Sequence, residues 1–248
     1  MSTVITPTVD LAVLRSACSK CALSQLCLPA GVNSEDMLRL DETVQTRRPL
    51  QRGQTLFAEG AEFHSLFVVR AGTFKTFSSS EEGEVQILGF HLPGEIIGFD
   101  ALADDQHRCT AEALDQASVC EIPYNRLSDV AQKIPGLQRQ LMRIASREMV
   151  KDHEHLVMMG RRQAQERLAI FLRSLSDRHL RLQHIHDDFV LSMSRQDIAN
   201  YLGQVVDTVS RLFTRFEESG VLTVDRKRIR IRDFARLSEL AGEASPLR

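Results

Sequence analysis

The sequence predicts an α+β protein in which a β-roll, a long helix and a helix-turn-helix follow one another along the chain. Three observations predict this order. Between residues 47 and 123, short apolar runs alternate with glycines, a pattern typical of all-β rolls and barrels. After Pro135, apolar residues recur at every third or fourth position, which predicts a helix with one apolar seam. Residues 195–214 then have the spacing of a helix-turn-helix.

Composition limits the class of protein. The 248 residues are 43% hydrophobic, enough for two domains with real cores. No apolar stretch approaches a membrane span and the N-terminus does not resemble a signal peptide, so we expect a cytoplasmic protein. Residues 161–248 carry a net charge of +4, against −6 for residues 1–160. This basic C-terminal third favours a polyanionic partner.

Three cysteines lie within ten residues near the N-terminus. Cys18, Cys21 and Cys27 form the run C-x2-C-x5-C. Because cytoplasmic thiols stay reduced and the five cysteines are an odd number, metal ligation is favoured over disulfides. Either Cys120 or Cys109 could supply a fourth ligand. The C-x2-C spacing also occurs in structural zinc sites, although such sites usually have a second close cysteine pair, which is absent here. The residues alone therefore leave zinc and an iron–sulfur cluster about equally favoured.

The long helix carries a seam suited to pairing with another helix. Its positions are Met142, Ala145, Met149, Asp152, Leu156 and Met159. In a symmetric dimer the two Asp152 carboxylates would face each other, and their repulsion would make an unassisted dimer weak. The alternative is that this carboxylate turns outward into solvent.

Shorter elements flank these regions. A short helix is expected within 33–46, and a second long helix from about residue 161, which Gly160 separates from the first. One face of this second helix carries Ala164, Leu168, Phe171, Leu172 and Leu175. The segment 178–190 is polar and rich in histidine. The clustered histidines are expected on the surface rather than at a metal: His153, His155, His179, His184 and His186.

The helix-turn-helix is recognised by position. Ala199 falls where the two helices cross, and Gly203 falls in the turn, where a left-handed backbone is needed. The shared core is expected from Ile198, Leu202, Val209 and Leu212. On the second helix, Asp207, Ser210 and Arg211 share one face, with Thr208 beside them. Carboxylate, hydroxyl and guanidinium groups are suited to reading base edges.

A basic hairpin is expected after the two helices. Arg226, Arg228, Arg230 and Arg232 alternate, so they would share one strand face. Such a wing lies along phosphates, where contacts position the protein but do not specify sequence.

The order of elements resembles the CRP/FNR superfamily of bacterial transcription factors, and its FNR-type members in particular. The resemblance covers essentially the whole chain. It implies a cysteine-rich segment at 1–32, a cyclic-nucleotide-binding-like β-roll at 33–135, a dimerisation helix at 136–160 and a winged helix-turn-helix at 161–248. The matching stretches are Cys18–Pro29, Gly89–Gly94, Gly98–Asp100, Ala117–Pro123 and Val206–Arg211.

The resemblance implies an oxygen-responsive regulator. Its [4Fe–4S] cluster, held by Cys18, Cys21, Cys27 and Cys120, would be degraded by oxygen. The cluster-loaded protein would form a homodimer through the seam around Ala145, Met149, Asp152 and Leu156. The dimer would bind double-stranded DNA at two TTGAT-type half-sites about one helical turn apart.

Two parts of the chain correspond to functional positions of the family. Asp207 replaces the glutamate usual in the family, and its side chain is one methylene shorter. The resemblance therefore leaves open which base of the half-site Asp207 reads. The turn Gly83-Glu84 matches a loop that contacts RNA polymerase, although a plain hairpin turn accounts for it equally well.

Other function classes lack support. There is no G-x-G-x-x-G after a strand, no P-loop and no H-E-x-x-H, so we do not expect an enzyme. Glu95 and Arg108 echo a cyclic-nucleotide pocket, but their separation and Cys109 disagree with it, so no cyclic nucleotide is expected. We expect both to be solvated or salt-bridged at the surface. The remaining alternatives are a same-fold regulator that senses nitric oxide, redox state or a small molecule, and a structural zinc site in place of the cluster.

Overall fold

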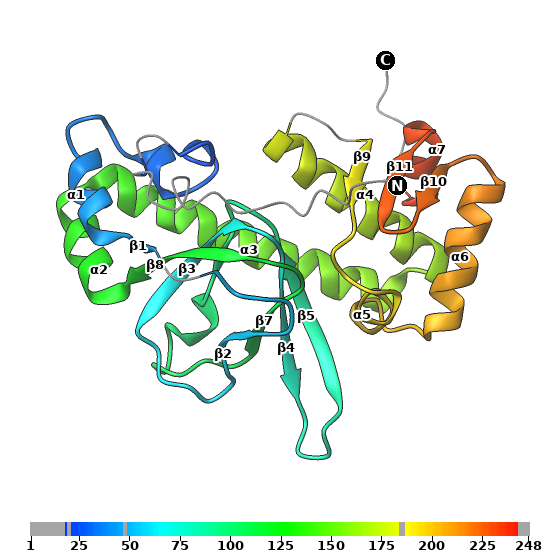
Figure 1. Cartoon of the computed structure of the whole chain (residues 1–248), viewed down its shortest axis with the longest axis horizontal. Coiled ribbons are helices and arrows are strands. Elements are labelled where there is room, and N and C mark those ends of the chain that lie inside the picture. The colour runs from blue at the N-terminus through cyan, green and yellow to red at the C-terminus, as the bar shows by residue number, and fades with distance from the viewer. Residues whose placement is uncertain (1–17, 19–20, 47–48, 184–186, 243–248) are drawn as a thin grey trace, which may run out of the picture.

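The computed structural model describes residues 18, 21–46, 49–183 and 187–242. One long helix, α3 (Pro135–Arg161), runs from the N-terminal elements and the β-roll to a helical C-terminal unit (Figure 1). The α+β fold predicted from the sequence is confirmed. In the described part of the chain, no helix is long and apolar enough to cross a membrane.

The β-roll consists of two antiparallel sheets with strand orders β1-β8-β3-β6 and β2-β7-β4-β5. Phe74, Val69 and Val119 are fully buried within it, because alternate residues of each strand face the core. The strands are β1 (Gln45–Thr46), β2 (Thr55–Phe57), β3 (Ser65–Ala71), β4 (Phe74–Ser79), β5 (Val85–His91), β6 (Ile96–Ile97), β7 (Thr110–Ala113) and β8 (Ser118–Pro123).

Helices close one side of the first sheet. The short helix expected within 33–46 is present as α1. Leu40, Leu127 and Leu137 pack with Ile122 of β8 in a single apolar cluster. The proline at the first helical position starts α3, since its missing N–H is not needed there. These elements are η3 (Leu28–Gly31), α1 (Met37–Thr43), η4 (Phe99–Ala101) and α2 (Tyr124–Lys133).

The C-terminal unit packs helices around a small sheet of order β10-β11-β9. Leu168, Leu172 and Leu175 of its first helix are buried, as their spacing predicted. Strand β9 lies within the polar segment 178–190 and adds a third strand to the predicted hairpin. The elements are α4 (Ala164–Gln183), β9 (Asp188–Val190), α5 (Arg195–Tyr201), α6 (Val206–Glu218), β10 (Leu222–Asp225), β11 (Arg228–Ile231) and α7 (Phe234–Leu240).

A buried ion pair joins the β-roll to α4. Arg178 donates to Glu95 at 2.7–2.8 Å and to the carbonyl of Phe90 at 2.6 Å, while Lys151 of α3 lies 3.6 Å from the same carboxylate. Burial would raise the pKa of Glu95, but Arg178 and Lys151 outweigh it and hold the pKa at about 2. Glu95 was expected to be solvated or salt-bridged at the surface: it is salt-bridged, but it is half-buried because α4 covers it. Arg108 is an exposed partner of Asp104.

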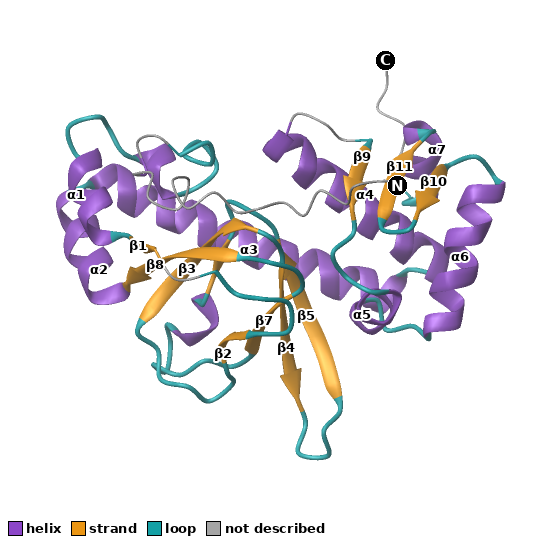
Figure 2. Ribbon diagram, in the orientation of Figure 1, coloured by secondary structure: helices purple, strands orange, loops and turns teal. Residues whose placement is uncertain are grey.

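The β4–β5 hairpin provides a second junction, against α5 (Figure 2). The Asn200 side chain accepts from the backbone N–H of Ile87 at 2.6 Å and donates to the carbonyl of Val85 at 2.6 Å. Lys75 lies 3.2 Å from Asp197. Backbone hydrogen-bonding groups on the open edge of strand β5 are thus paired with a side chain of the helix-turn-helix.

We expect Glu95→Ala to lower the free energy of unfolding by about 3 kcal/mol, because it leaves the Arg178 guanidinium buried without its carboxylate. Urea denaturation followed by circular dichroism measures this. The control Arg108→Ala removes an exposed ion pair and should leave the transition almost unmoved. The double variant Glu95→Leu/Arg178→Met should recover most of the loss. A single variant as stable as the wild type would contradict the account.

Candidate metal centre and nucleic-acid interface

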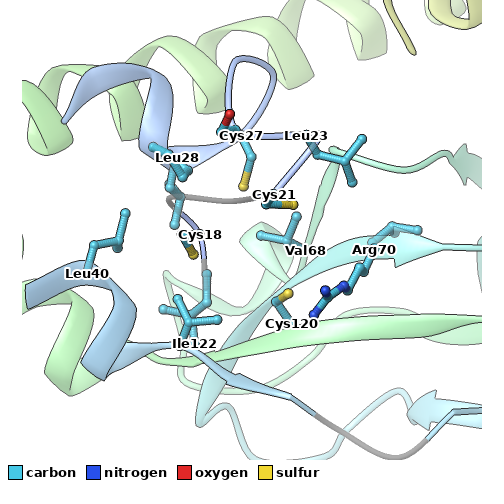
Figure 3. A pocket seen from close by; sticks show the side chains of 14 residues that line it. Cys18, Cys21, Leu23, Cys27, Leu28, Leu40, Val68, Arg70, Cys120 and Ile122 are labelled. Carbon is cyan, nitrogen blue, oxygen red and sulfur yellow. The ribbon is translucent and has the colours of Figure 1, made fainter. Parts of the chain in front are cut away.

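Four thiols line one cavity between the N-terminal segment and the first sheet of the roll. Figure 3 shows the sulfur atoms of Cys18, Cys21, Cys27 and Cys120 around the same space. The rest of the wall is largely apolar and includes Leu23, Leu28, Leu40, Val68 and Ile122, with Arg70 beside Cys120. The cavity volume is about 30 Å³.

Local backbone contacts place each cysteine. The N–H of Cys18 donates to the Asp41 carboxylate of α1 at 2.6 Å, which holds the start of the segment against the roll. The N–H of Cys21 donates to the carbonyl of Cys18 at 3.2 Å, and that of Cys27 to the carbonyl of Leu23 at 3.1 Å. Cys120 lies on β8, a strand between β1 and β3, so its backbone is fixed by two neighbours.

Burial raises the pKa of three thiols of the cavity, those of Cys18, Cys27 and Cys120, and so favours their protonated form in the absence of a cation. It raises the pKa of Cys18, and the neighbouring Asp41 adds to the effect. It raises the pKa of Cys27 to about 12. Burial also raises the pKa of Cys120, with Arg70 acting in the opposite direction. A bound metal would reverse this, since a cation stabilises the thiolates that ligate it.

The donor set suits an iron–sulfur cluster. Four thiols in a largely apolar pocket can hold such a cluster, and the same set can hold a structural zinc ion. Either group would need the four cysteines as thiolates.

Cys109 lies elsewhere. It is buried in the roll, and its sulfur lies 3.5 Å from the Asp100 carboxylate. Burial raises the pKa of this thiol, and Asp100 raises it further. Of the two candidates for a fourth ligand, the structure brings Cys120 to the N-terminal cysteines.

The cysteine segment rests directly on the first turns of α3. The buried side chain of Gln140 donates to the carbonyl of Cys27 at 3.1 Å. Next to it, the backbones of Gly31 and Gly136 approach so closely that a Cβ on either residue would overlap the carbonyl oxygen of the other. The cysteine segment is therefore in direct contact with α3, with no other element between them.

The proposed seam of α3 lies largely open in the single chain. Met142, Met149 and Leu156 are 60–67% exposed, and Asp152 is exposed between them. Ala145 and Met159 are half-buried. A row of exposed apolar side chains on one helix face is typical of a helix that binds another helix.

Two of the histidines expected on the surface are half-buried instead. The ring of His155 stacks on Tyr201 with centroids 4.2 Å apart, and that of His179 stacks on Phe189 at 5.0 Å. Burial lowers the pKa of both. His153 is exposed, as expected. His184 and His186 lie outside the described residues.

The helix-turn-helix has the expected geometry. Gly203 has φ +58° in the turn between α5 and α6. Ser194 begins α5 with a capping box: the Ser194 hydroxyl accepts from the N–H of Asp197, and the Asp197 carboxylate accepts from the N–H of Ser194. The four core residues are buried as predicted: Ile198, Leu202, Val209 and Leu212.

The outer face of α6 presents the proposed reading residues. The Arg211 guanidinium lies 2.7 Å from the Asp207 carboxylate, and both side chains are largely exposed. The Ser210 hydroxyl donates to the carbonyl of Val206 at 2.9 Å, and Thr208 is half-buried. The structure thus brings Asp207, Ser210 and Arg211 together on one open surface.

The hairpin differs in part from expectation. Arg228 and Arg230 share a face, but both guanidinium groups bind the Asp188 carboxylate of β9 at 2.6–3.1 Å. Arg226 lies in the turn with φ +56° rather than on the strand. Asp188 neutralises part of the basic face, a contact that strand alternation could not reveal. Arg226 and Arg232 are both exposed.

The turn at Gly83-Glu84 forms the tip of the β4–β5 hairpin. Gly83 has φ +82°, and its N–H donates to the carbonyl of Ser80 at 3.0 Å. Both residues are exposed, and the tip projects away from the body of the molecule (Figure 2).

Comparisons with known proteins agree with this architecture. Residues 47–133 match the family model of the cyclic nucleotide-binding domain, and residues 166–240 match that of the Crp-like helix-turn-helix domain. The transcriptional activator protein FnrA of Stutzerimonas stutzeri is 46% identical, covering 92% of this chain and 93% of its own. The fumarate and nitrate reduction regulatory protein of Vibrio cholerae is 44% identical, covering 91% and 90%.

A solved structure gives the same result. FixK2 of Bradyrhizobium japonicum superposes with a TM-score of 0.73 and 28% identity, covering 82% of this chain and 99% of its own. The fold and the helix-turn-helix therefore define a DNA-binding transcription regulator, not an enzyme. The chain belongs to the CRP/FNR family, and its curated relatives are regulators of the FNR and Anr type.

We expect Gly136→Ala to separate the cysteine segment from α3, because the new methyl group would overlap the carbonyl of Gly31. The overlap should destabilise the packed segment by about 1–3 kcal/mol, so that it opens more often. The thiols of the metal-free protein should then react about tenfold faster with Ellman's reagent. The control is Gly160→Ala in the same helix, where a Cβ meets nothing within 4 Å. Equal reaction rates for the two variants would contradict the proposed contact.

Proposed function

We propose that this chain is an oxygen-responsive, cytoplasmic transcription regulator whose iron–sulfur cluster controls dimerisation and DNA binding. One observation carries the proposal: the four thiols line a single cavity whose cysteine segment contacts α3 through Cys27 and Gln140. The names of the FNR and Anr relatives as anaerobic regulators and activators support it.

The proposed cofactor is a [4Fe–4S] cluster on Cys18, Cys21, Cys27 and Cys120. Bound there, it would supply a metal–sulfur core that oxygen or nitric oxide can attack. The protein's part is to hold four thiolates in an apolar wall that excludes water. The FNR-type relatives favour the cluster over zinc.

The proposed output acts through α3. The cysteine segment that would hold the cluster contacts the first turns of the helix through Gln140 and Gly136, so a shift of that segment would be felt directly by α3. Along the seam, the exposed Met149 and Leu156 favour pairing with a second copy, while Asp152 opposes it. A small change in the helix would therefore shift the balance between monomer and dimer, because the apolar side chains and the carboxylate of the seam act in opposite directions.

The proposed DNA site is a palindrome of two TTGAT-type half-sites. Asp207, Ser210 and Arg211 would contact base edges, with Thr208 beside them, while Arg226 and Arg228 would lie near phosphates. The Gly83-Glu84 tip would contact RNA polymerase, an assignment that its exposure supports. We propose that each segment has its own role. Residues 1–32 bind the cluster, 33–135 form the sensor β-roll, 136–160 form the dimerisation helix and 161–248 bind DNA.

Replacing the distal ligand tests the cofactor. We expect Cys120→Ser, purified without oxygen, to lack the iron and the visible absorption of the wild type, because serine cannot complete the thiolate set. Cys109→Ser is the matched control and should retain both. Iron analysis and visible spectra measure this. Wild-type iron content in Cys120→Ser would contradict the assignment of Cys120 as a ligand. A colourless wild-type protein with stoichiometric zinc would show that the cysteines hold zinc instead of a cluster.

Removing the seam carboxylate tests the output. We expect Asp152→Ala to form a dimer that binds palindromic DNA even in air, since the repulsion across the seam is gone. Sedimentation velocity and fluorescence anisotropy measure this. Glu154→Ala, which removes an exposed carboxylate of the same helix, should remain a monomer in air. If Asp152→Ala also stays monomeric without a cluster, repulsion is not what holds the subunits apart.

A further inference from the structure

The guanidinium of Arg167 lies between the carboxyl ends of two helices. Arg167 belongs to the first turn of α4. Its Nη2 donates to the carbonyl of Met159 in the last turn of α3 at 2.8 Å, and its Nη1 to the carbonyl of Leu202 at the end of α5 at 3.0 Å. Its Nε donates to the carbonyl of Arg162, between α3 and α4, at 3.0 Å.

This position suits an arginine. The last carbonyls of a helix lack partners within it and carry partial negative charge, so a cation among them is favourable. Here one guanidinium meets the ends of α3 and α5 at once. Its planar fork directs donors toward three fixed oxygens, whereas a lysine ammonium is a compact charge without that geometry.

Neighbouring contacts strengthen the same junction. The methyl group of Met159 packs on Gly203, whose φ of +58° favours glycine at this position. The Gln204 side chain donates to the carbonyl of Ala164 at 3.0 Å. The end of α3 is thus attached to the turn of the helix-turn-helix, and not only to the start of α4.

We propose that Arg167 is a positioning residue that locks the helix-turn-helix to the end of α3 and thereby sets the half-site spacing that the dimer accepts. In a dimer paired through α3, the distance and rotation between the two recognition helices depend on how each α6 is held against its own α3. Arg167 supplies the directional part of that attachment. The inference rests on the proposed binding of a palindrome by a dimer.

The test measures DNA affinity as a function of spacing. Anaerobically prepared protein is titrated against labelled duplexes with two half-sites at the optimal spacing, with spacers one base pair longer or shorter, and with a single half-site. Each added base pair shifts one half-site by about 3.4 Å and about 35°. For the wild type we expect affinity to fall about tenfold when the spacing changes by one base pair, because the second half-site is lost.

For Arg167→Ala we expect the dimer to persist and its affinity for the single half-site to stay within about twofold of the wild type. Its preference among spacings should shrink to about threefold or less, because the half-sites no longer have to match one fixed geometry. Arg167→Lys keeps the charge but not the fork, and should relax the preference in the same way. Arg181→Ala, which removes an exposed arginine from the last turn of α4, should keep the wild-type profile.

The outcomes separate the two proposals. Wild-type protein without a spacing preference would refute the proposed palindromic binding. A wild-type preference that survives in both Arg167 variants would refute the positioning role alone. Loss of secondary structure or of single-site binding in both variants would make Arg167 a folding residue and would also overturn the inference.

Discussion

The close backbone contact between Gly31 and Gly136 is the constraint on which the rest of this molecule depends. Through this contact the cysteine segment packs on the first turn of α3. The Gln140 amide donates to the carbonyl of Cys27 and fixes the position of the segment on the helix. The opposite end of the same helix is held to the helix-turn-helix by Arg167. One rigid element of 27 residues therefore connects the thiol cavity to the DNA-facing surface.

Features with a local cause could be predicted from the sequence. Gly203 and the buried residues around it follow from spacing within one helix pair, so the turn and its core were predicted correctly. The long helix and its exposed seam follow from a repeat of three and four residues. The β-roll could be predicted as a class, because glycines separate its strands, but the pairing of those strands could not.

Features that depend on contacts between distant segments could not be predicted. Glu95 and Arg178 are 83 positions apart, and no periodicity indicates that they meet in a buried ion pair. Asp188 falls in the polar, histidine-rich segment 178–190, for which no strand was predicted, yet it lies in strand β9 and binds two arginines of the wing. For Cys120, only the family resemblance selected it over Cys109; the geometry that brings it to the cavity arises from sheet pairing.

The central claim is that the state of the thiol cavity decides whether two chains pair. Sedimentation velocity of anaerobically purified wild-type protein, recorded at both the protein and the visible cluster absorption, tests it most directly. The account predicts that the visible absorption sediments with a dimer before exposure to air, and that bleaching in air converts the same sample to monomer. A colourless dimer whose mass does not change with oxygen would contradict it.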